Sequence, residues 1–66
     1  MRPKNSVTLA GARVSAGLTQ TELADKLSVS KQTVLMWERG KRTPRPYVVE
    51  SIASICGFSA DNIFLQ

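Results

Sequence analysis

The sequence predicts an all-α fold, a compact bundle of five short helices. Three observations predict it. Residues that cap helix N-termini recur along the chain, apolar residues three or four positions apart follow them, and glycines close the segments. We find no strands, repeats or internal linker in the sequence. With 66 residues, the chain has the length of one small domain.

The N-terminal part contains an arm and the first helix. Residues 1–7 are expected to form a flexible basic arm, so that the folded domain spans residues 8–66. Thr8 can cap a first helix over residues 9–16, because its hydroxyl can accept a hydrogen bond from a free backbone amide. Gly17 can end this helix, since glycine adopts the left-handed conformation without strain.

The second helix has a well-defined start. Thr19 is its N-cap and Glu22 stands three residues later, which is the spacing of a capping box. Leu23, Ala24 and Leu27 then lie on one side of the helix and predict that this side is buried. The helix is expected to end near Leu27.

A third helix is expected over residues 31–39. Ser30 can cap its N-terminus, and Gly40 can end it. Val34 and Trp37 are three positions apart and form the row that is expected to face the core. The other faces of this helix are polar and basic, so we expect them to lie at the surface.

The C-terminal part begins with a stiff basic loop, residues 41–45, after which Pro46 fits the first position of a fourth helix. Gly57 is expected to close this helix. Ser59 can cap a last short helix, in which Asp61 lies at the favourable end of the helix dipole. The apolar row of the fourth helix consists of Tyr47, Val48, Ile52, Ile55 and Cys56.

The composition does not indicate an enzyme. The chain has no His, its only Cys is Cys56, and its five acidic residues are scattered without the spacing of metal ligands or of a nucleophile and base. We therefore expect no catalytic, cofactor-binding or metal site. A single Cys argues for a reducing compartment, and no apolar run reaches the roughly 18 residues of a membrane span. The sequence thus predicts a cytoplasmic protein without a membrane partner.

The charge distribution points to a polyanion. The net charge is +4, and five of the nine basic residues fall within fifteen positions, where Glu38 alone opposes them. A one-signed cluster of this kind attracts nucleic acid. The cluster consists of Lys31, Arg39, Lys41, Arg42 and Arg45. Two short capped helices joined by a tight turn, the second of them basic, form a helix-turn-helix and therefore indicate DNA binding.

Two apolar residues, Leu35 and Met36, stand among polar residues on the outer faces of the third helix. They could fill the edge of the core or form a subunit contact. Alternatively, they could meet thymine methyl groups in the major groove, while Lys31 and Gln32 offer hydrogen bonds to guanine and adenine edges.

The chain resembles a known family on a spaced set of residues: Leu18-Thr19-Gln20, Glu22-Leu23-Ala24, Val29-Ser30, Thr33-Val34, Trp37-Glu38, Gly40-Lys41 and Asp61-Asn62-Ile63-Phe64. It is similar to the Cro and phage-repressor type of helix-turn-helix domain, the xenobiotic-response-element family, which has the lambda-repressor-like fold. The resemblance covers roughly residues 8–64. It implies a transcriptional regulator that binds double-stranded operator DNA as a weak dimer with helix 31–39 in the major groove. We expect a repressor that acts by occupying a promoter, although the same domain could activate by contacting polymerase.

The resemblance also implies roles for single residues. Arg13 and Glu38 correspond to an ion pair that ties the first helix to the end of the third. The expected base contacts are Lys31, Gln32, Leu35 and Met36. The expected phosphate contacts are Gln20, Thr33, Arg39, Lys41 and Arg42.

Two residues depart from the family pattern. Ser28 stands where the turn usually has a left-handed Gly, and serine tolerates that conformation less well. Lys31 stands where several phage members carry a Gln that braces the Gln of the second helix. Because lysine is longer and charged, we expect it to favour guanine or to contact a phosphate instead.

Two questions stay open at this point. The apolar C-terminal segment could form the dimer surface or could close the core; its candidate residues are Phe58, Ile63, Phe64 and Leu65. The alternative function is that of a protein-interaction module, such as an antitoxin-type regulator that binds a partner protein as well as DNA.

Overall fold

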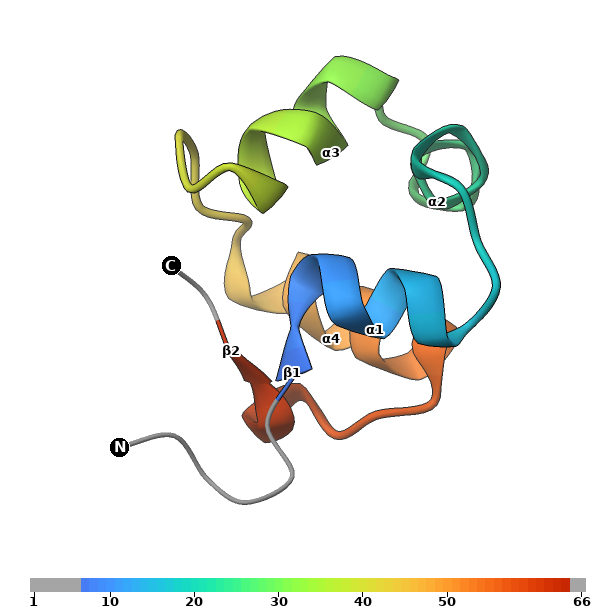
Figure 1. Cartoon of the computed structure of the whole chain (residues 1–66). Coiled ribbons are helices and arrows are strands. Elements are labelled where there is room, and N and C mark those ends of the chain that lie inside the picture. Colours follow the sequence, from blue (N-terminus) through green and yellow to red (C-terminus); the bar gives the residue numbers. More distant parts are fainter. Residues whose placement is uncertain (1–6, 65–66) are drawn as a thin grey trace.

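The computed structural model describes residues 7–64. The expected N-terminal arm lies outside the described residues except for Val7, and so do Leu65 and the side chain of Phe64. Within this range the helices are α1 (Leu9–Ser15), α2 (Gln20–Leu27), α3 (Lys31–Glu38) and α4 (Pro46–Cys56). A 3₁₀ turn, Ala60–Asn62, follows, and two short strands complete the structure, β1 (Val7–Thr8) and β2 (Ile63–Phe64). In Figure 1, α2 and α3 lie at one end of the molecule, and the two strands lie at the other.

The prediction of a fifth helix is wrong. The segment forms a single 3₁₀ turn and then β2, which pairs in parallel with β1, so that Val7 lies opposite Ile63 and Thr8 opposite Phe64. The expectation that the chain has no strands is wrong for the same reason. Pairing of β2 depends on a segment more than fifty residues away in sequence, and tertiary pairing of this kind overrides local helix signals.

The predicted helix starts are confirmed. The hydroxyls of Thr8 and Ser30 accept hydrogen bonds from backbone amides three residues later, at 3.0 Å and 3.1 Å. Both bonds of the capping box are present: Glu22 N–H donates to the Thr19 hydroxyl at 3.0 Å, and Thr19 N–H donates to the Glu22 carboxylate at 2.8 Å. Pro46 occupies the first turn of α4 without a side-chain cap.

Each of the four described helices is followed within two residues by a residue with a left-handed backbone, and these residues are Gly17, Ser28, Gly40 and Gly57. The amide of the next residue bonds back to the carbonyl five positions earlier, at 2.9–3.1 Å. After α1, α2 and α4 this next residue is apolar and packs against the core. After α3 it is Lys41, which is exposed. The end of α3 therefore presents a positive charge where the other helices present an apolar side chain.

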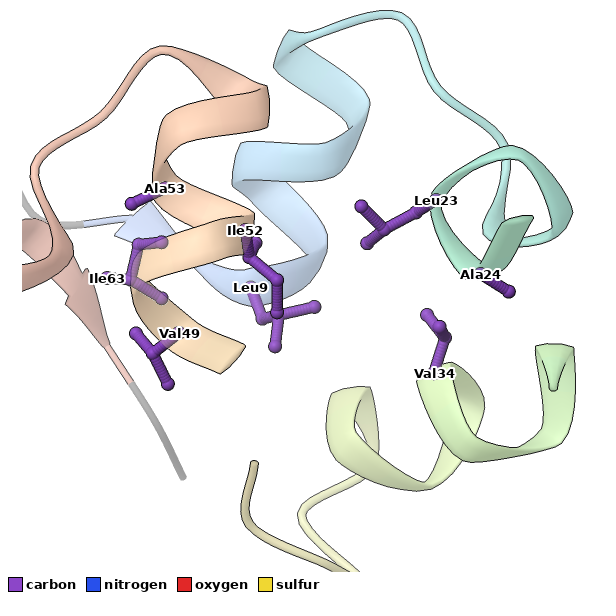
Figure 2. Packing of buried hydrophobic residues seen from close by; sticks show 8 residues of the cluster. All are labelled: Leu9, Leu23, Ala24, Val34, Val49, Ile52, Ala53 and Ile63. Atoms are coloured by element: carbon purple, nitrogen blue, oxygen red, sulfur yellow. The ribbon is translucent and has the colours of Figure 1, made fainter. Parts of the chain in front are cut away.

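The core joins all four helices and β2. Leu23 of α2, Val34 of α3 and Ile52 of α4 are completely buried. Figure 2 shows Leu23 and Val34 facing this core from α2 and α3. The other members of the cluster are Leu9, Ala24, Val49, Ala53 and Ile63. The core thus holds α3 by the face of Val34, whereas Lys31, Gln32 and Arg39 remain exposed.

The structure confirms the predicted position of Trp37 but not that of Tyr47. Trp37 packs half-buried against the core beside Val34, as the spacing predicted. Tyr47 is wrongly placed in the apolar row of α4, because its side chain is 67% exposed. The buried row contains Val49 and Ala53 in its place, since Tyr47 lies in the first turn of the helix, beyond the edge of the core.

Candidate nucleic-acid interface

The outer face of α3 carries the residues expected to contact bases. Lys31 and Gln32 are exposed in the first turn of the helix, and Leu35 and Met36 are half-buried one turn later. Neither Leu35 nor Met36 is among the described apolar residues that pack against the core. The face therefore offers donors and acceptors at one end and apolar contact surface in the middle, which is a combination that suits base edges and thymine methyl groups.

Two hydrogen bonds between Ser30 and Thr33 fix the N-terminus of α3. The Thr33 amide donates to the Ser30 hydroxyl, and the hydroxyls of Thr33 and Ser30 lie 2.9 Å apart in a second hydrogen bond. Thr33 itself is half-buried. Its hydroxyl is thus held close to the surface at the positive end of the helix dipole, where an anion is stabilised.

The basic loop that follows α3 is fixed against the end of the helix. The amides of Lys41 and Arg42 both donate to the Met36 carbonyl, at 2.9 Å and 3.4 Å. Pro44 is buried, whereas Lys41, Arg42 and Arg45 are exposed. The backbone is therefore anchored at both ends of the loop while the three charged side chains point to solvent.

A cavity of about 190 Å³ lies between α3, this loop and the start of α4. Its apolar lining includes Trp37, and its polar lining includes Thr33 and Arg42. Thr43, Arg45 and the exposed Tyr47 also line it. The sequence analysis placed Arg45 in the basic cluster without assigning it a contact, and it did not assign Thr43 or Tyr47 to the site, because only the fold of the loop brings these residues next to α3.

A hydrogen-bonded network of three side chains joins α1, α2 and α3. Arg13 Nε lies 2.6 Å from Glu38 Oε2, and Arg13 Nη2 lies 3.3 Å from Glu38 Oε1. The remaining donor, Arg13 Nη1, bonds to the Leu18 carbonyl at 2.8 Å. The side chains of Arg13 and Glu38 are only 14% and 8% exposed. The charges are therefore largely withdrawn from water, so each depends on the other for its stability.

Gln20 is the third member of this network. Its Nε2 donates to Glu38 Oε1 at 3.0 Å, and its side chain is half-buried at the start of α2. The sequence analysis had treated Gln20 as a phosphate contact alone. No sequence signal indicates the bond to Glu38, because 18 positions separate the two residues.

The C-terminal segment contributes to the core. Ile63 is 8% exposed and belongs to the core cluster, so an exposed role in a dimer surface is wrong for this residue. The reason is the pairing of β2 with β1, which turns Ile63 toward α4. Phe58 also packs against the core, although it remains half-buried. The side chains of Phe64 and Leu65 lie outside the described part.

The described residues also bear on metal binding, cysteine reactivity and membrane insertion. Among residues 7–64, no group of three or more His, Cys, Asp or Glu side chains is placed to hold a metal ion. Cys56 packs half-buried against the core, and burial raises the pKa of its thiol despite the opposing effect of Arg13. No helix in the described range is both long and apolar enough to cross a membrane.

Comparison with known proteins gives consistent matches. The sequence profile of the family described as Helix-turn-helix matches residues 9–63. An uncharacterized HTH-type transcriptional regulator of Methanocaldococcus jannaschii is 40% identical over 53 residues, which cover 80% of each chain. One from Methanothermobacter thermautotrophicus is 38% identical over 45 residues, covering 68% of this chain and 65% of the relative. One from Archaeoglobus fulgidus is 32% identical over 53 residues, covering 80% of this chain and 76% of the relative. No solved structure matches the chain significantly.

Proposed function

Because the chain belongs to the helix-turn-helix family, we propose that it is a transcriptional regulator that binds a specific sequence of double-stranded DNA. One observation carries the proposal: on the outer face of α3, Lys31 and Gln32 are exposed and Leu35 and Met36 do not pack against the described core, and this face lies next to a fixed loop of exposed basic residues. An α-helix fits the major groove, and basic side chains at its end then reach the phosphates.

The proposed base contacts come from the outer face of α3. Lys31 donates to guanine, and the Gln32 amide pairs with adenine, since its donor and acceptor match the edge of that base. Leu35 and Met36 contact thymine methyl groups. The exposure of the first two residues and the absence of core contacts for the other two support these roles.

The proposed phosphate contacts surround this face. Arg39, Lys41 and Arg42 supply positive charge, and Gln20 and Thr33 supply hydrogen bonds. Phosphate contacts provide most of the affinity and make it dependent on salt, whereas the base contacts provide discrimination.

We further propose that the protein acts as a dimeric repressor. One short recognition helix reads only a few base pairs, so a second copy on a second half-site is needed for a specific operator. Occupancy of DNA that overlaps a promoter is sufficient to block transcription.

The test is selection of bound sequences from a random duplex pool, followed by titration of the selected sequence and a scrambled one at two salt concentrations. We expect a palindromic sequence that binds at least about a thousandfold more tightly than the scrambled duplex. Equal and salt-sensitive binding to every duplex would contradict the proposal and would direct attention to a protein partner.

A pair of variants checks which surface reads the DNA. The double substitution Lys31→Ala and Gln32→Ala should remove the preference for the base pairs that these two residues read but leave the fold and the background binding intact. Lys26→Ala is the matched control, because it removes the same charge from an exposed position in α2. Loss of preference in the control as well would show that α3 is not the reading element.

A further inference from the structure

We propose that Glu38 is a positioning residue for DNA binding, which acts by orienting the Gln20 amide toward a phosphate. Glu38 itself would not touch DNA, since its side chain is 8% exposed and occupied by Arg13 and Gln20. The inference rests on the proposed function, because it concerns how one phosphate contact of that function is prepared in the free protein.

The carboxylate determines which way the Gln20 amide faces. An ionised carboxylate can only accept hydrogen bonds, so the group that approaches Glu38 Oε1 at 3.0 Å must be the Gln20 NH₂. This NH₂ has a second N–H. No partner for it, or for the amide oxygen, is found among the described residues. The half-buried side chain therefore keeps one donor for a group outside the protein, and a phosphate oxygen is an acceptor for it.

Arg13 makes this arrangement compatible with DNA. An unpaired carboxylate behind Gln20 would repel the phosphate that Gln20 approaches, because a low-dielectric surrounding screens charges poorly. The Arg13 guanidinium neutralises Glu38 through bonds to both carboxylate oxygens, at 2.6 Å and 3.3 Å. A neutral pair can therefore hold the amide without opposing the approach of DNA.

Holding Gln20 in one orientation in the free protein is expected to increase the affinity for DNA. A glutamine that is already held in one orientation does not lose this freedom again when DNA binds. For one side chain, the corresponding effect on the dissociation constant is roughly 2- to 10-fold. Gln20 is neutral and releases no counterion, so its contribution should not change the salt dependence of binding.

The test is a double-mutant cycle on the dissociation constant for the selected duplex, with wild type, Gln20→Met, the paired replacement Arg13→Met with Glu38→Met, and all three substitutions together. Methionine keeps the length of the Gln20 side chain without its amide, and the paired replacement removes the carboxylate without leaving a buried charge unpaired. Gln20→Met and the paired replacement should each weaken binding by roughly 2- to 10-fold, and the combined variant should bind no worse than Gln20→Met alone. Multiplied effects, or no effect of either change, would overturn the inference.

A second measurement does not depend on the stability of a variant. Nitrogen-15 relaxation of side-chain amides in the free wild-type protein should show that Gln20 is ordered, whereas Gln32, which is exposed, serves as the mobile control. Equal mobility of the two amides would overturn the inference. A wild-type protein that binds no selected duplex would instead refute the proposed function, so the two failures are distinguishable.

Discussion

At the scale of single residues, Ser28 is the clearest departure from the local rules of helix ends. It is the one described residue other than glycine with a positive φ, at 58°, and its side chain is exposed. The left-handed conformation costs a residue with a side chain about 1 kcal/mol relative to glycine. The turn between α2 and α3 therefore contains local strain that packing of the two helices has to offset.

This strain gives a simple prediction. Ser28→Gly should raise the free energy of unfolding by up to about 1 kcal/mol, because glycine adopts the same backbone without the cost of a side chain. Urea melts of the two proteins measure the difference. A glycine variant less stable than the wild type would show that the Ser28 side chain compensates for its backbone.

The Glu22 carboxylate gives a pH-dependent prediction. Its hydrogen bonds with the backbone and side chain of Thr19 lower its pKa below the ordinary value of 4.5, and Lys26 adds to this effect. A carboxylate with a lowered folded-state pKa stabilises the protein above its unfolded-state pKa, and this contribution disappears as the pH falls through the folded-state value. Glu22→Gln keeps an acceptor in the capping box but has no charge to titrate.

We therefore expect the stability difference between wild type and Glu22→Gln to be largest above the ordinary pKa of 4.5 and to become smaller as the pH falls below it. Thermal melts across this range provide the measurement. The other carboxylates titrate in both proteins and cancel in the difference. A difference that does not vary with pH would contradict the expected role of the charge.

At the scale of elements, the network of Arg13, Glu38 and Gln20 ties three helices together. Its charges are mostly buried, and its bonded groups come from α1, α2, α3 and the loop after α1. The orientation of α3 thus depends on side chains of α1 and α2 as well as on Val34 and Trp37.

Removing one charge of this network should destabilise the folded protein strongly. Arg13→Ala should lower the free energy of unfolding by about 3 kcal/mol or more, because Glu38 stays buried without its cation. For a domain of this size the total stability is only roughly 3 to 10 kcal/mol. Urea melts test this, with the exposed Arg39→Ala as a control that should change stability by less than about 0.5 kcal/mol. A loss below about 1 kcal/mol for Arg13→Ala would show that water reaches Glu38 and replaces Arg13.

At the scale of the whole molecule, a dimer can be distinguished from a monomer by how steeply its affinity for DNA falls with salt concentration. Arg39, Lys41 and Arg42 give three cations for phosphates in each copy, hence six in a dimer. Raising the salt concentration fourfold should then weaken binding by about a thousandfold for a dimer and by about fortyfold for a monomer. Fluorescence titrations of the selected duplex at 50 and about 200 mM salt distinguish the two, and a monomer-like slope would argue against the dimer.

Much of this protein follows from local sequence. The caps at Thr8, Thr19 and Ser30 fix where three helices begin, because the hydrogen bonds involved span only three residues. Glycine marks three of the four helix ends for a similar reason. The spacing of Val34 and Trp37 predicted the buried face of α3 and, by exclusion, its outer face.

Only the tertiary structure decided the rest. The last segment became β2 because it reaches β1 across the fold, and this partner is invisible in the local sequence. Gln20 came to lie against Glu38, and Tyr47 came to the edge of a cavity beside α3, through the packing of helices distant in sequence. Capping and helical periodicity act over a few residues, so the sequence itself determined the four α-helices and most of their buried faces. Strand pairing and the buried polar network join distant residues, so they depend on how those helices pack.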